Sequence, residues 1–218
     1  MLNASFVRTL GDRDRIYVTR SERSEVSWVF PTYGDVPPHH MIHLIVESAF
    51  DVGQGFWGRV DAGIDPSRIM AQANRMGGPD KYAAFGDDLS DLLLAEALAN
   101  CGWLVEGNSG EDLQHQIVTI CREANLAPPA LLSAERTARV RAVLLHLAER
   151  WRGLKPKGAI QLHFDSQNPV RGFDEANFPL RSVMRPRLSR EPLCVKDYRR
   201  AGRLLAQLPT EPDHRFVE

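Results

Sequence analysis

Residues 15–47, RIYVTRSERSEVSWVFPTYGDVPPHHMIHLIVE, decide the fold of this chain. Within them, residues 15–20 and 25–30 alternate apolar with polar side chains and are rich in β-branched and aromatic residues, which is the pattern of half-buried strands. After two prolines, which suit the first turn of a helix, residues 39–50 change to a helical period with a broad apolar side. We therefore expect short antiparallel strands whose apolar face is covered by a helix.

Outward from this stretch, the sequence predicts one strand before it and mainly helices after it. Residues 5–9 open a strand that ends at a polar turn, and residues 158–164 alternate again and could return to the sheet as a fourth strand. The helical segments that we expect between them are 87–101, 111–124 and 134–153. The predicted fold class is α+β: a small antiparallel N-terminal sheet of three or four strands, packed against the histidine-bearing helix 39–50 and a mostly helical remainder.

The composition changes near residue 165, where the periodic pattern ends. We expect residues 1–165 to form a single α+β domain and residues 166–218 to form an arm rich in proline and arginine. A short helix over 196–208 is predicted within this arm.

Overall composition excludes several classes of protein. The 218 residues contain 27 Lys and Arg against 28 Asp and Glu, a balance that argues against a dedicated nucleic-acid-binding protein. Three scattered cysteines fit neither a disulfide framework nor a cysteine-rich zinc module. Asn3, Ser5 and Arg8 interrupt the N-terminus before any apolar stretch, so we expect no signal peptide. No apolar run has the roughly 18 residues that a membrane helix needs, and we expect a cytoplasmic protein.

Charge is balanced overall but segregated locally. Residues 84–115 carry seven acidic residues and no Lys or Arg, whereas basic residues crowd residues 136–157 and the arm from Arg181 to Arg190. One interpretation is that these faces meet within the fold or across a homodimer. This supports the alternative to an enzyme: an interaction or scaffold protein that dimerises, or binds a partner, through the basic arm.

The segment with chemical content is the start of the predicted helix. His39 and His43 are spaced i, i+4, the separation at which two imidazoles can bind one metal ion, and Glu47 follows one turn later. Glu47 lies about 12 Å along the axis from His39, so it suits a hydrogen bond to His43 better than a place on the same ion. The alternative is a polar helix face whose histidines bond to water and to Glu47.

A metal site here needs further donors. A catalytic zinc site normally has three protein ligands, and the candidates for the third are His115, His146, His163 and Asp165. In the zinc-peptidase motif HExxH, a glutamate beside the first histidine acts as general base, and this chain has His40 there. We therefore expect no peptidase chemistry by that route. Metal-assisted hydrolysis with a divalent metal such as zinc is the least strained enzymatic interpretation.

The run PHHMIHLIVESAFDVGQGFWGRVDAG, preceded by SWVFPTYGD, resembles a group of uncharacterised bacterial proteins. Their shared segment is similar to PHDxxHxxVE followed by a GFWG element. His39, His43 and Glu47 match this pattern, and His40 replaces an acidic residue. The resemblance covers roughly residues 14–63 and implies a shared site without naming a reaction.

Overall fold

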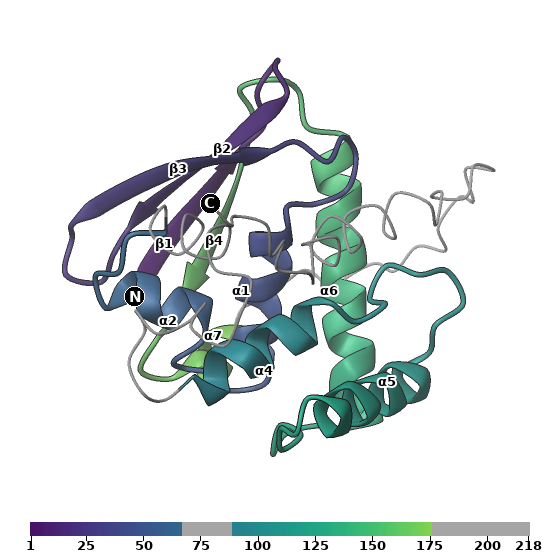
Figure 1. Cartoon of the computed structure of the whole chain (residues 1–218). Coiled ribbons are helices and arrows are strands. Elements are labelled where there is room, and N and C mark those ends of the chain that lie inside the picture. The colour runs from purple at the N-terminus through teal and green to yellow at the C-terminus, as the bar shows by residue number, and fades with distance from the viewer. Residues whose placement is uncertain (67–88, 176–218) are drawn as a thin grey trace, which may run out of the picture.

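A computed structural model describes residues 1–66 and 89–175 of the chain. Its β-strands form one four-stranded antiparallel sheet with the order β3-β2-β1-β4, as Figure 1 shows. The strands are β1 (Leu2–Val7), β2 (Arg13–Thr19), β3 (Glu25–Pro31) and β4 (Ala159–Phe164). This confirms the predicted α+β class and the return of residues 158–164 as a fourth strand. β1 begins three residues before the predicted strand.

Alternation along the strands separates a core face from an outer face. In β4, Ile160, Leu162 and Phe164 are buried and the residues between them are exposed. The register with β1 places Leu2 opposite Phe164 and Phe6 opposite Ile160. Because side chains directly opposite each other lie on the same face, these pairs continue one apolar surface across both strands.

Helices lie against this surface or pack on one another. They are α1 (His39–Ala49), α2 (Phe56–Asp61), α4 (Ser90–Ala99), α5 (Gly110–Glu123), α6 (Ala134–Arg152) and α7 (Pro169–Glu175). α1 lies in the centre of the molecule, between the sheet on one side and the long α6 on the other (Figure 1). Every residue of α1 from Met41 to Ala49 is buried. The helix is therefore enclosed on all sides rather than half exposed, and its polar residues must find partners inside the protein.

Local capping signals explain where α5 and α6 begin. Ser133 accepts a hydrogen bond from the backbone N–H of Arg136 at the start of α6, as its place before the helix predicts. At the start of α5, Ser109 and Asp112 form a reciprocal capping box. Both caps satisfy backbone N–H groups that have no partner within a helix.

Residues 169–175 differ from the extended arm that the sequence predicts beyond residue 165. They form α7, which packs against α1. Phe173 is buried there, and the guanidinium carbon of Arg139 lies 4.6 Å from the centre of its ring. Pro169 is the other buried residue of this helix, and two such positions are too few to show a helical period in the sequence. The basic stretch Arg181 to Arg190 and the predicted helix 196–208 lie outside the described residues.

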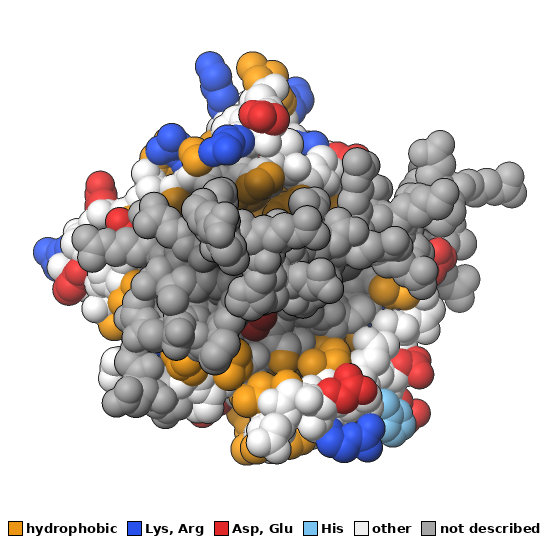
Figure 2. All heavy atoms as spheres, viewed as in Figure 1, with side chains coloured by type: hydrophobic (Ala, Val, Ile, Leu, Met, Phe, Trp, Pro, Cys, Tyr) orange, Lys and Arg blue, Asp and Glu red, His pale blue; other side chains and the backbone are white. Residues whose placement is uncertain are grey.

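Two arginines of the basic stretch 136–157 have an acidic partner in α7, which lies outside the acidic stretch 84–115. Arg136 and Arg139 of α6 both form ion pairs with Asp174 of α7, and Arg136 also donates to the carbonyl of Ala49. Figure 2 shows basic and acidic side chains interspersed around the edge of the described surface. No helix in the described part of the chain is both long enough and apolar enough to cross a membrane.

Candidate metal centre

The two histidines of the predicted pair meet on the first turns of α1. The Nε2 atoms of His39 and His43 lie 3.2 Å apart, and their rings are nearly perpendicular, at 84°. This arrangement follows from the i, i+4 spacing, which stacks side chains one turn apart on the same helix face. Both histidines therefore present the same ring nitrogen to the same point.

A third donor comes from α4 and not from any of the four candidates considered from the sequence. Oε2 of Glu96 lies 3.2 Å from Nε2 of His43, and Oε1 lies 3.5 Å from Nε2 of His39. In the described part of the chain, His39, His43 and Glu96 form a group of donors that could hold one metal ion.

The spacing of these atoms suits a tetrahedral ion. When metal–donor distances are about 2.0–2.2 Å, as for zinc with imidazole and carboxylate ligands, neighbouring donor atoms lie about 3.3–3.6 Å apart. The contacts of 3.2 Å between the histidines, and of 3.2 and 3.5 Å from the histidines to Glu96, are close to these values. The two contacts of Glu96 are made by different oxygens, so a tetrahedral ion would take one of these oxygens together with both histidines and leave the fourth corner open.

Glu47 contacts the other ring nitrogen of His43, Nδ1, as the sequence predicts. Its Oε1 lies 3.0 Å from Nδ1 of His43 and is fully buried with the rest of the side chain. When Nδ1 carries the ring proton and donates a hydrogen bond to Glu47, Nε2 of His43 is left with a lone pair that points toward His39 and Glu96. This is the arrangement that prepares an imidazole for a metal ion.

The segment after α1 holds Glu47 in turn. Oε1 of Glu47 accepts a hydrogen bond from the backbone N–H of Phe56, and Oε2 accepts one from that of Trp57. Phe56 and Trp57 are buried in the core. The PHHMIHLIVE and GFWG parts of the sequence motif are thus joined in space through Glu47.

Two glycines of this segment are required by close contacts. A Cβ atom on Gly55 would lie 2.7 Å from Cδ of Glu47, and one on Gly58 would lie 1.8 Å from the carbonyl oxygen of Gly53. Any larger residue at these positions must displace the carboxylate or the turn. Gly55 therefore lets the backbone approach Glu47, and Gly58 lets the turn close against Gly53.

Burial and hydrogen bonds shift the pKa values of the three interacting groups. Burial alone lowers the pKa of His43, but the hydrogen bonds to Glu47 and Glu96 outweigh it and raise the pKa to about 9. Burial raises the pKa of Glu47, against the hydrogen bonds from His43, Trp57 and Phe56. For Glu96 the effect of burial is smaller than that of the hydrogen bonds from His39 and His43, and its pKa falls well below the usual value.

His40 faces away from this cluster. Its ring packs against the rings of Phe56, Trp28 and Phe30, with centres 4.8, 5.8 and 6.2 Å away. Burial, followed by the charges of His39 and His43, lowers the pKa of His40 to about 3, so the ring is neutral at pH 7. The position that carries the general base in HExxH is here part of an aromatic contact.

The other histidine and aspartate candidates lie elsewhere. His163 is on the exposed face of β4, with Nδ1 against the side-chain oxygen of Asn3. Asp165 accepts a hydrogen bond from the backbone N–H of Gln167 just after β4. His115 is exposed on α5, and His146 is half-buried on α6. None of the four belongs to the donor group.

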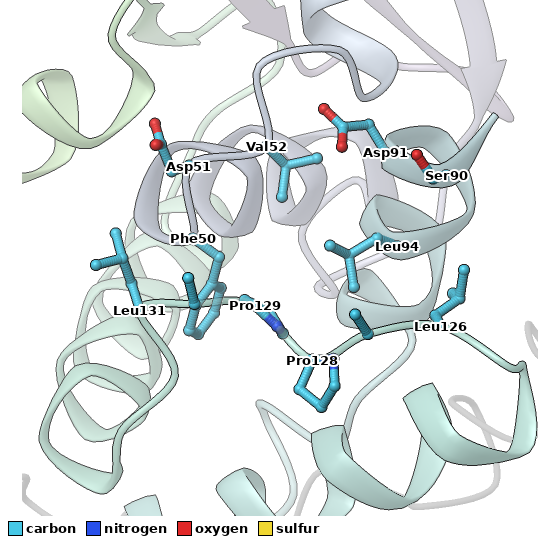
Figure 3. Close-up of a pocket in the computed structure, with 12 residues that line it drawn as sticks. Phe50, Asp51, Val52, Ser90, Asp91, Leu94, Leu126, Pro128, Pro129 and Leu131 are labelled. Carbon is cyan, nitrogen blue, oxygen red and sulfur yellow. The ribbon is translucent and has the colours of Figure 1, made fainter. Parts of the chain in front are cut away.

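An open hollow among the described residues is separate from the cluster. It has a volume of about 420 Å³ and lies at the opposite end of α1, between Phe50, the first turn of α4 and the loop 126–131. Figure 3 shows Val52, Leu94 and Pro129 around it, with the carboxylates of Asp51 and Asp91 at its edge. Its walls are apolar, and none of its lining residues is a donor of the cluster.

Glu96 was not predicted as a metal donor, because it lies among other acidic residues in the sequence. It is one of seven acidic residues in 84–115, a stretch that looks like a solvated face. The available signal was its place four residues after the buried Leu92 and two before the buried Leu98, at the border of the apolar stripe of α4.

Comparison of the chain with protein-family models, with curated proteins and with solved structures finds no match.

Proposed function

We propose that this protein binds one divalent transition-metal ion, with zinc as the first candidate, through His39, His43 and Glu96. The observation that carries the proposal is the convergence of three donors from two helices at the spacing of a tetrahedral site. Two imidazoles and a carboxylate are ligands that zinc and other first-row metals accept. The buried Glu47 supports the same assignment because it orients the His43 ring.

We further propose that the centre performs metal-assisted hydrolysis. Three protein donors leave one coordination position for water, as in catalytic zinc sites, whereas structural zinc sites are closed by four. An ion held in this way supplies Lewis acidity and activates water near neutral pH. His39 and Glu96 keep the site accessible, because 30% and 39% of their side-chain surfaces are exposed.

The competing explanation is a hydrogen-bond network without an ion. A protonated His43 can donate from Nδ1 to Glu47 and from Nε2 to Glu96, which satisfies the same distances. The two explanations differ in whether the chain retains metal.

The test is the metal content of the full, untagged chain, measured by plasma mass spectrometry after incubation with zinc and removal of excess ion. We expect about one ion per chain, lost in His39→Ala/His43→Ala and in Glu96→Gln. His115→Ala is the matched control, because it removes an exposed histidine outside the cluster and should leave the metal content unchanged. Wild-type protein that retains neither zinc nor cobalt would overturn the proposal in favour of the network.

Hydrolysis is tested separately on metal-loaded protein, with activated ester and phosphate ester substrates. We expect turnover that a chelator abolishes and that returned zinc restores. Metal-loaded wild-type protein whose rate equals that of His39→Ala/His43→Ala would refute the hydrolase proposal and leave metal binding standing.

A further inference from the structure

A residue outside the donor group contacts Glu96 directly. Asn100 follows the last residue of α4 and lies one turn after Glu96. Its Nδ2 donates to the backbone carbonyl of Glu96 over 2.9 Å and to the side-chain Oε1 of Glu96 over 3.0 Å. One amide group therefore uses both of its protons on the same residue.

This contact distinguishes the two oxygens of Glu96. Oε1 accepts from Asn100 and lies 3.5 Å from Nε2 of His39, whereas Oε2 makes the shorter contact with the histidines, 3.2 Å to Nε2 of His43. A carboxylate can bind a metal ion through one oxygen or through both. When an N–H group holds one oxygen, the lone pairs left for the ion belong mainly to the other.

We propose that Asn100 is a positioning residue of the metal centre, which makes Glu96 bind the ion through Oε2 alone. The inference rests on the proposed metal binding and adds what sets the coordination number. With Glu96 bound through one oxygen, the protein supplies three donor atoms and one tetrahedral position stays open for an outside ligand. With both oxygens bound, the geometry is no longer tetrahedral.

A purely structural role for Asn100 is the alternative. Its backbone N–H already donates to the carbonyl of Glu96, so the bond from Nδ2 to that carbonyl is a second contact at the end of the helix. The bond to Oε1 joins side chains at i, i+4, which can stabilise a helix, and it also fixes the orientation of the carboxylate. A helix-ending role changes the stability of the protein, whereas a positioning role changes the geometry of the bound ion.

The experiment titrates the full chain with cobalt(II), whose visible absorption bands are stronger in tetrahedral than in five-coordinate sites. Asn100→Leu keeps a side chain of similar size and removes the donor. We expect it to bind cobalt about tenfold more weakly, with the molar absorptivity of the bound ion reduced about twofold or more. Asn100→Gln retains an amide and should restore the wild-type spectrum. Asn3→Ala, on the outer face of the sheet, is the control and should match wild type.

The outcomes distinguish the positioning role of Asn100 from metal binding itself. A folded Asn100→Leu variant that binds cobalt with the wild-type spectrum would overturn the positioning role and leave metal binding intact. Wild-type protein that binds no cobalt and no zinc would overturn metal binding itself, and the role of Asn100 with it.

Discussion

Glu47→Gln tests how the buried carboxylate supports the centre. The substitution keeps the shape of the side chain and removes its charge and one of its two acceptor oxygens. In the wild-type structure these oxygens accept three hydrogen bonds, from His43 and from the backbone N–H groups of Phe56 and Trp57. A glutamine amide oxygen can replace Oε1 or Oε2, so the amide nitrogen must face at least one of these donors.

The size of the effect follows from these contacts. One buried N–H left without an acceptor costs about 1–3 kcal/mol, and a hydrogen bond to a charged group contributes about 1.5–3 kcal/mol. Relief from burying a charge offsets part of this loss. We therefore expect the free energy of unfolding of the metal-free protein to fall by about 2 kcal/mol. With a urea dependence of about 2 kcal/mol per molar, the midpoint falls by about 1 M.

The assay is urea unfolding in the presence of a chelator, followed by zinc competition titration of the folded variant. Zinc affinity should fall about tenfold or more, because the variant no longer holds the His43 ring through a carboxylate. Glu149→Gln, at an exposed position on α6, is the matched control and should change stability by less than about 0.5 kcal/mol. A Glu47→Gln protein with the unfolding midpoint and zinc affinity of this control would refute the reasoning.

Three further predictions concern the surroundings of the site. Gly58→Ala should lower the free energy of unfolding by about 3 kcal/mol or prevent folding, because its Cβ would meet the carbonyl oxygen of Gly53 at 1.8 Å. Gly11→Ala is the control, because a Cβ there has room, and equal thermal melting temperatures for the two variants would contradict the prediction. Burial, with a smaller effect of a neighbouring thiol, raises the pKa of Cys101 to about 12. Iodoacetamide at pH 8 should therefore label Cys101 at least about tenfold more slowly in the folded protein than in urea, as measured by peptide mass spectrometry. Equal labelling rates would place the thiol in contact with solvent. His40 has a folded pKa of about 3 against about 6.5 in an unfolded chain, so only the unfolded state takes up its proton as pH falls below 6.5, and stability declines toward pH 4. His40→Phe should therefore flatten the decline measured by urea unfolding in chelator, and a variant that loses stability over this range as steeply as wild type would argue against a neutral ring.

Local patterns predicted the four strands and the longer helices of the fold. The strands around residues 15–20 and 25–30, the helix from His39 and the fourth strand near 158–164 were all predicted from spacing, because side-chain alternation reports directly on which face of an element is buried. The same spacing placed His39 above His43 and Glu47 one turn further on, since positions four residues apart on a helix always share a face.

The tertiary structure decided what surrounds these residues. The sequence predicts a polar strip on α1 with one apolar side, but α1 is enclosed all round and Glu47 is fully buried. A half-exposed helix and an enclosed one can share the same periodicity, because periodicity describes a single helix and not the number of elements that pack on it. α7 was not predicted, because its two buried residues, Pro169 and Phe173, are too few to show a helical period.

The third donor shows the limit most clearly. The convergence of His39 and His43 follows from their spacing alone, because they are four positions apart on one helix and helix geometry is fixed. Glu96 is 53 residues from His43, and its approach depends on how α4 packs against α1. That packing is set by the fit of many apolar side chains at once, so it becomes visible only when the whole core is assembled.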